Sequence, residues 1–227
     1  MRKCPVKLCA ITIGESPRPE LWDDIAQNLR FPFKAYHLGL LDDPQNIPSL
    51  QVQNHGLNAL VTQLNNGSTV WISSSKAHQA LSRMAQNIIV RKDTPHALII
   101  LCTAIHDLGR EVNKIALYPG TLIRETILNQ SEDPIGIILP DKGQWPSLDP
   151  ALSEKDVILY DLMPPGRGED FQKAGDFLKN KGARCIALHC MAYPLSAITC
   201  LSPVFGNAVA HPGQLIIEAL NNRFTSS

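Results

Sequence analysis

The stretch LIILCTA at residues 98–104 can be aligned with IALHCMA at residues 186–192, which places Cys102 and Cys190 in register. The apolar residues of the two stretches fit other registers equally well, so the cysteines select this alignment. A short apolar run of this kind is typical of a strand that is buried on both faces of a parallel sheet. The pair therefore predicts an internal repeat, with one such strand and one cysteine in each half.

A second pair of apolar runs supports the repeat. Residues 8–13 read LCAITI and end at Gly14, and residues 135–140 read IGIILP. Further strands are predicted at 69–73, 96–101, 134–139, 157–159 and 184–188, and helices at 19–29, 54–64, 75–90, 118–129, 169–180, 195–200 and 212–221. Such alternation favours parallel sheets with right-handed crossovers. We expect an α/β fold with two pseudo-symmetric lobes.

Charge and hydropathy exclude several classes of protein. Lys and Arg together number 21, as do Asp and Glu, and this balance argues against a nucleic-acid or membrane-surface partner. The segment between Arg184 and Glu218 has no charged residue, but Pro194, Pro203 and Pro212 interrupt it, so it does not read as a membrane span. The early apolar run is too short for a signal peptide. We expect a cytoplasmic protein.

The six cysteines show neither a CxxC pair nor any other zinc-binding spacing. Without a secretory signal, a disulfide framework is not expected, so the cysteines are predicted to be thiols. No metal, nucleotide or flavin motif is visible, and we expect no cofactor.

Cys102 and Cys190 each follow the carboxyl end of a buried strand, where open α/β sheets form their ligand crevices. Two halves related by an approximate two-fold axis would place these thiols opposite each other across a cleft. One thiolate could then remove a proton from an acidic carbon while the opposite thiol delivers one, or a thiolate could add to a double bond. The alternative is that both are buried structural cysteines.

The loop GESPRP at residues 14–19 directly follows the first strand. Ser16 and Arg18, together with loop amides and the start of the next helix, would form a cradle for a carboxylate or phosphate. The alternative is a proline-rigidified turn with a solvated arginine.

Three further features could belong either to the site or to the structure alone. The SSSK run at 73–76 could bring Lys76 to the same edge as Cys102, or it could be a helix N-cap with an exposed lysine. Strand alternation points His189 away from Cys190, which predicts a satisfied core histidine. The PPGRG run at 164–168 is interpreted as a surface loop.

Four segments together resemble the AroM family: ITIGESPR (11–18), LCTA (101–104), IILP (137–140) and CMAY (190–193). The similarity runs over nearly the whole length and includes Lys76 and the PV pair at 203–204. The chain more remotely resembles the aspartate/glutamate racemase superfamily, because CMAYP at 190–194 is similar to the Cys-Thr-His-Tyr-Pro of glutamate racemases. That superfamily has two α/β lobes, each contributing a cysteine to a cleft.

The resemblance implies that Cys102 and Cys190 form an acid/base pair. It implies that Ser16 and Arg18 hold a substrate carboxylate and that Thr103 donates a further hydrogen bond. The candidate substrate-binding residues are Ser16, Pro17, Arg18, Lys76, Thr103 and Met191. Met191 and Ala192 stand where glutamate racemases have Thr and His, which removes polar contacts to an amino-acid substrate.

We expect one unit over residues 1–227, with lobe 1 about 1–110 plus 203–227 and lobe 2 about 111–202. The leading hypothesis is a cofactor-independent racemase or isomerase that acts on a small carboxylate. The alternatives are a one-thiol decarboxylase or cis–trans isomerase, and a non-catalytic protein that binds a small carboxylate. The superfamily resemblance is also compatible with a homodimer.

Overall fold

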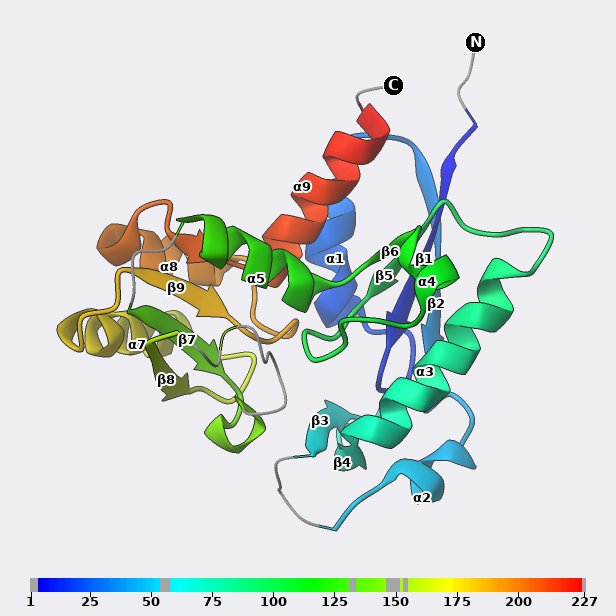
Figure 1. Ribbon diagram of the computed structural model, residues 1–227, viewed down its shortest axis with the longest axis horizontal. Helices are drawn as coiled ribbons and strands as arrows, with labels where there is room; N and C mark the ends of the chain where they lie inside the picture. The colour runs from blue at the N-terminus through cyan, green and yellow to red at the C-terminus, as the bar shows by residue number, and fades with distance from the viewer. Residues whose placement is uncertain (1–3, 54–57, 131–133, 146–151, 153–154, 226–227) are drawn as a thin grey trace.

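The computed structural model describes residues 4–53, 58–130, 134–145, 152 and 155–225 and contains two parallel four-stranded sheets (Figure 1). The first sheet has the order β2-β1-β5-β6. Its strands are β1 (Val6–Thr12), β2 (Phe33–Gly39), β5 (Ala97–Ile100) and β6 (Ala116–Leu117). The second has the order β10-β9-β7-β8. Its strands are β7 (Ile135–Leu139), β8 (Val157–Asp161), β9 (Cys185–Leu188) and β10 (Val209–Ala210).

The two sheets have the same topology when β1, β2, β5 and β6 are matched to β7, β8, β9 and β10. The match extends to single hydrogen bonds just beyond the central strands. The amide of Leu101 donates to the carbonyl of Ile11 at 2.7 Å, and the amide of His189 donates to the carbonyl of Ile138 at 2.7 Å. The predicted α/β fold with two pseudo-symmetric lobes is confirmed, and the cysteine register chosen from the sequence is the structural one.

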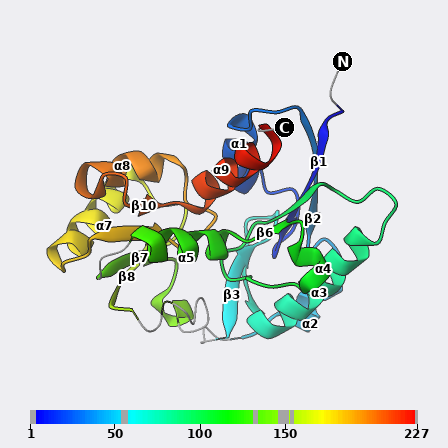
Figure 2. The ribbon, with the colours of Figure 1, turned by 45° about the horizontal axis from the view of Figure 1, so that its top comes forward.

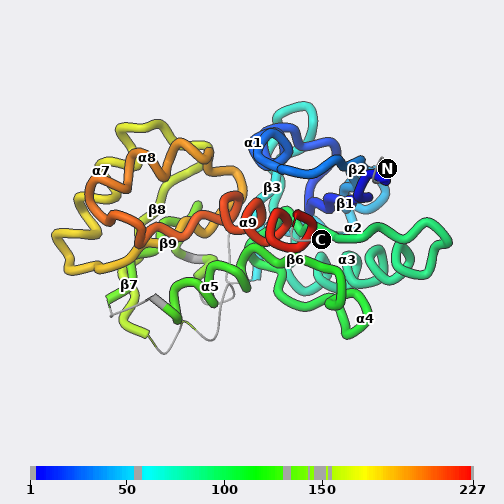
Figure 3. The backbone as a smooth tube through the Cα atoms, turned by 90° about the horizontal axis from the view of Figure 1, so that it is seen from above, coloured from blue at the N-terminus to red at the C-terminus, as the bar shows by residue number. Residues whose placement is uncertain are grey.

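Helices cover both faces of each sheet, as buried parallel sheets require. The longer helices are α1 (Pro19–Gln27), α3 (Ser74–Ile89), α5 (Pro119–Gln130), α7 (Gly168–Asn180), α8 (Ser196–Phe205) and α9 (Pro212–Thr225). Shorter helical segments are α2 (Asn46–Leu50), α4 (Arg110–Asn113) and η1 (Lys142–Gln144). Figures 2 and 3 show α9 lying along the junction of the two halves, where it contacts both α1 and α5.

The core follows the alternation of the strands. In β1, Leu8 and Ala10 pack toward α1 and α9, whereas Cys9 and Ile11 pack on the other face among residues of α3. The second sheet is likewise sandwiched, with α7 and α8 over one face and α5 against the other. Because both faces of both sheets are apolar, only the strand ends are left to carry polar chemistry.

The helix predicted at residues 54–64 is wrong where the structure describes it; residues 54–57 lie outside the described part. Residues 59–63 form the strand β3 (Ala59–Gln63), which pairs antiparallel with β4 (Thr69–Ser73). Leu57, Leu60, Val61 and Leu64 have helical spacing, but the Asn66-Gly67 pair forms a turn in which Gly67 has φ +84°, a conformation that favours glycine. The turn chemistry overrides the apolar spacing, and a hairpin results.

Within the described part of the chain, no helix has both the length and the apolarity needed to cross a bilayer.

Candidate active site

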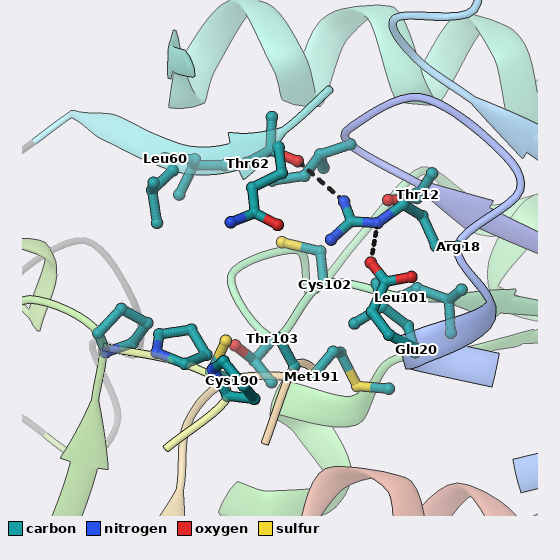
Figure 4. Close-up of a pocket in the computed structure, with 18 of the residues that line it drawn as sticks. Thr12, Arg18, Glu20, Leu60, Thr62, Leu101, Cys102, Thr103, Cys190 and Met191 are labelled. Atoms are coloured by element: carbon teal, nitrogen blue, oxygen red, sulfur yellow. Dashed lines mark hydrogen bonds and ion pairs between the residues drawn. The ribbon is translucent and has the colours of Figure 1, made fainter. Parts of the chain in front are cut away.

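A cavity of about 480 Å³ lies at the carboxyl ends of the central strands of both sheets (Figure 4). Thr12 ends β1, and Cys102 follows β5; from the other half, Pro140 follows β7 and Cys190 follows β9. The hairpin strand β3 adds Leu60 and Thr62, and most of the remaining lining is apolar. This is the crevice position expected for a ligand site in open α/β sheets.

Cys102 enters the pocket from the first half. The residue is 9 % exposed, and burial raises the pKa of its thiol to about 12. The backbone amides of Ala104 and Ile105 face the sulfur and oppose this shift, because hydrogen bonding favours the thiolate. The neighbouring Cys190 sulfur raises the pKa of Cys102 further, since two thiolates in one pocket repel each other.

Cys190 enters from the second half in the equivalent place. Burial raises the pKa of its thiol to about 11. The amide of Ala192 lowers this pKa, as the amide of Ala104, also two residues on, does for Cys102. Cys190 has one feature that its counterpart lacks: the guanidinium of Arg18 favours its thiolate. The two thiols therefore share a local backbone arrangement but differ in their electrostatic surroundings.

Arg18 is the cation of the pocket, and its residue is only 9 % exposed. Its Nε pairs with the Glu20 carboxylate, and its Nη1 donates to Thr62 Oγ1 at 3.4 Å (Figure 4). Within the described residues, Nη2 makes no hydrogen bond. A Cβ at Gly14 would lie 2.5 Å from Thr62 Oγ1 and 2.9 Å from Arg18 Nη1, so this close approach requires glycine.

Thr103 and Met191 also line the pocket. The Thr103 hydroxyl donates to the carbonyl of His189 at 3.1 Å and so joins the two halves. Because a hydroxyl has a single proton, which Thr103 already donates, this hydroxyl can only accept a hydrogen bond from a ligand. The donor role that the resemblance gave Thr103 is therefore not available in this conformation. Met191 is buried among residues of α1 and α9 and presents an apolar wall.

The other three predicted binding residues lie outside the lining of this pocket. The Ser16 hydroxyl donates to Asp42 Oδ2 at 2.8 Å, and its amide donates to Asp42 Oδ1 at 2.6 Å, so Ser16 ties the loop after β1 to the loop after β2. Pro17 is exposed. Lys76 is exposed and donates to the carbonyl of Ser49 at 3.0 Å, while Ser73 caps α3. The N-cap interpretation of the SSSK run is confirmed.

The prediction that His189 is a satisfied core histidine is wrong. His189 is 2 % exposed, it lines the pocket, and neither ring nitrogen has a hydrogen-bond partner in the part of the chain that the structure describes. Strand alternation does not separate His189 from Cys190, because β9 already ends at Leu188. Burial lowers the pKa of the imidazole to about 4, and His106 adds to this shift.

Several lining residues were missing from the sequence-based site. Leu60 and Thr62 lie on the strand that the apolar spacing had predicted as a helix. Pro164 and Pro165, predicted to form a surface loop, line the pocket from the segment after β8. Among the described residues, no group of three or more His, Cys, Asp or Glu side chains is placed to hold a metal ion.

Comparison with known proteins identifies the family of this chain. The family model described as AroM protein matches residues 8–220. The chain belongs to the AroM family. A search of curated proteins finds no match to the AroM chain.

Two solved structures are similar to the whole AroM chain. Allantoin racemase from Pseudomonas fluorescens has 12% identity and a TM-score of 0.59, with 97% of this chain and 92% of that chain covered. Glutamate racemase from Francisella tularensis, solved with D-glutamate, has 14% identity and a TM-score of 0.57, with 97% and 81% covered. At these identities the similarity shows the fold alone. The AroM chain therefore has the racemase-like architecture that its sequence predicts.

The AroM pocket thus combines three chemical elements. Two thiols at equivalent strand ends face one cavity, a buried guanidinium lies beside one of them, and a neutral imidazole lies on the wall. Such a set can bind an anion, and each thiol can take up or release a proton from its own side.

Proposed function

We propose that this protein is a cofactor-independent racemase or isomerase that acts on a small carboxylate, with Cys102 and Cys190 as its acid/base pair. The observation that carries the proposal is the equivalence of the two thiols. Each follows the central strand of its own half, each has an amide two residues on that favours its thiolate, and both reach one cavity.

Arg18 would hold the substrate carboxylate. A guanidinium can bind a carboxylate with two N–H groups, and Nη2 has no hydrogen bond to give up within the described residues. Carboxylate binding would place the adjacent carbon within the cavity shared by the two sulfurs. The same cation would stabilise the negative charge that spreads onto the carboxylate when that carbon loses a proton.

The proposed reaction moves one proton in and one out. The thiolate of one cysteine removes the proton from the carbon next to the carboxylate, which gives a thiol and a carbanion. The opposite thiol then donates its proton to the other face of that carbon and becomes the thiolate. The carbon inverts, the total charge is unchanged, and the cysteines have exchanged protonation states. Turnover in the reverse direction begins from this exchanged state.

Proton exchange observed by NMR in D₂O tests the proposal. The protein is incubated with a panel of 2-amino, 2-hydroxy and unsubstituted small carboxylates, and deuterium is sought at the carbon next to the carboxylate. Exchange should be lost in Cys102→Ser and Cys190→Ser but kept in Cys200→Ser, a half-buried thiol on α8 that does not line the cavity. Loss in Cys190→Ser alone would instead favour a one-thiol reaction.

A non-catalytic carboxylate-binding protein is the second candidate, and one observation favours it. Burial raises the pKa of both thiols to about 11 or above, so both are protonated in the empty pocket at neutral pH. Such a protein would catalyse no deuterium exchange in any compound of the panel. One compound would still bind, with binding kept in both cysteine variants and lost in Arg18→Ala.

A further inference from the structure

His189 is a buried polar residue that the proposed acid/base reaction does not use. The residue lines the cavity, and both ring nitrogens are shielded from solvent with no hydrogen-bond partner among the described residues. Its ring packs edge-on against Trp145, at 6.5 Å between centroids. Leaving a buried imidazole without partners is unfavourable, because the donor and acceptor lose their hydrogen bonds to water.

The fold does not require a histidine at this position. Leu101 occupies the equivalent place in the first half, where its amide makes the same 2.7 Å bond to the neighbouring strand. Leu101 is also buried and also lines the cavity. Since a leucine fills this position in one half, the imidazole in the other half is not explained by packing.

We propose that His189 recognises an uncharged hydrogen-bonding group, such as a hydroxyl or a carboxamide, carried by the carboxylate ligand. This inference rests on the proposed binding of a carboxylate at Arg18. A neutral imidazole offers one donor and one acceptor, and either kind of group can bind one of them. The ligand would then have a carboxylate, an apolar body against the largely apolar walls, and a polar group at His189.

Electrostatics favour an uncharged group over an ammonium. His106 disfavours positive charge on the His189 ring, the residue's own backbone opposes this weakly, and no carboxylate among the described residues acts on the ring. Two carboxylates also line the cavity, but Glu20 is paired with Arg18, and Asp24 accepts from the Leu195 amide at 3.4 Å. An ammonium beside His189 would therefore be buried without a counter-charge, which is costly.

Matched carboxylates separate these possibilities. The probes are hexanoate, 6-hydroxyhexanoate, 5-carbamoylpentanoate and 6-aminohexanoate, each with shorter and longer homologues, titrated by isothermal calorimetry. For at least one chain length, the wild type should bind the hydroxyl or carboxamide member about 5- to 150-fold more tightly than the unsubstituted member. The amino member should bind no more tightly than the unsubstituted one.

The variant His189→Leu puts a leucine into the pocket wall, as Leu101 does at the equivalent position of the first half. This variant should bind the unsubstituted acid as the wild type does but lose the preference for the hydroxyl or carboxamide. His189→Gln, which keeps a neutral donor and acceptor, should restore part of it. His211→Gln is the matched control, because His211 is equally buried but bonds to the Tyr193 carbonyl at 3.1 Å and accepts from the Gly213 amide at 3.1 Å.

The outcomes also distinguish this inference from the proposed function. A preference that survives in His189→Leu, its absence in the wild type, or a preference for the amino member would overturn the role of His189 and leave the proposed function standing. A His189-dependent preference without cysteine-dependent deuterium exchange would uphold this role and contradict the racemase proposal. If no probe binds the wild type, the role of His189 is overturned, and the proposed function still depends on the cysteine-dependent deuterium exchange.

Discussion

The guanidinium of Arg18 lowers the pKa of Cys190, whereas no cation lowers that of Cys102 among the described residues that act on it. Arg18 follows β1 in the first half, and Cys190 follows β9 in the second, so this influence crosses the junction between the lobes. The pseudo-symmetric thiols are therefore unequal, and Cys190 is the one that loses its proton more readily.

Alkylation by iodoacetamide should show this inequality. Because only thiolates react, the rate at Cys190 should rise about tenfold per pH unit from neutral pH toward its pKa of about 11, and Cys102 should react more slowly at every pH. Peptide mass spectrometry at graded pH gives both rates. Arg18→Met removes the cation and should raise the pKa of Cys190, which slows its alkylation; faster labelling of Cys102 in the wild type would contradict the assignment.

Removal of the Glu20 charge should strengthen anion binding. Glu20 pairs with Arg18 Nε, so a ligand carboxylate must share the guanidinium with it. In Glu20→Gln the competing charge is gone, and a carboxylate that binds the wild type should bind several-fold more tightly. Glu20 is exposed, so little change in stability is expected. Weaker binding in Glu20→Gln, measured by calorimetry, would indicate that Glu20 itself contacts the ligand.

Gly14→Ala should disturb the carboxylate site. The added Cβ would lie 2.5 Å from Thr62 Oγ1 and 2.9 Å from Arg18 Nη1, so one of these groups must move. We expect a loss of about 1–3 kcal/mol of stability and weaker carboxylate binding. Gly168→Ala is a suitable control, because there the nearest atom is Cys200 Sγ at 3.4 Å. Equal thermal stability and ligand affinity of Gly14→Ala and the wild type would show that the loop accommodates the methyl group.

Acid should destabilise the protein through two histidines. Burial lowers the pKa of His189 and of His211 from 6.5 to about 4, so between these values the unfolded chain binds protons that the folded protein does not. Stability is therefore retained above pH 6.5 and falls as the pH drops toward 4, by about 3 kcal/mol for each histidine. Urea unfolding across this range measures the slope.

The two histidines should then behave differently on replacement. His189→Gln and His211→Gln should each reduce the acid-dependent slope. At pH 7, His211→Gln should also cost about 1–3 kcal/mol, because a bonded buried group is lost, whereas His189→Gln should cost little. A large loss of stability at pH 7 in His189→Gln would show that the ring has a structural partner.

The sequence was most informative at the strand ends. Cys102 and Cys190 could be placed because each directly follows an apolar run, and the carboxyl ends of parallel strands meet at one crevice. Arg18 could be placed for the same reason. The prediction for His189 is wrong because strand alternation does not extend to a residue beyond the end of β9.

Other parts of the site depend on tertiary structure that local patterns do not reveal. The residues at 59–63 have helical apolar spacing, yet they pair with β4 and supply Thr62 to the pocket. Lys76 follows a strand end as Cys102 does, but it lies in the first turn of α3 and its ammonium donates to the carbonyl of Ser49 in α2. β2 was not predicted, because its alternating partly exposed residues lack the apolar run of the central strands.

In the proposed reaction, two thiols act from opposite sides of one carbon. The most direct test incubates a single enantiomer of a turned-over carboxylate in D₂O and follows both enantiomers by mass spectrometry at low conversion. We expect deuterium in the product enantiomer and almost none in the remaining substrate, because the first thiol returns the proton it took and the second donates one from solvent. Equal early deuterium in both enantiomers would mean that a single base serves both faces, and would contradict the two-thiol account.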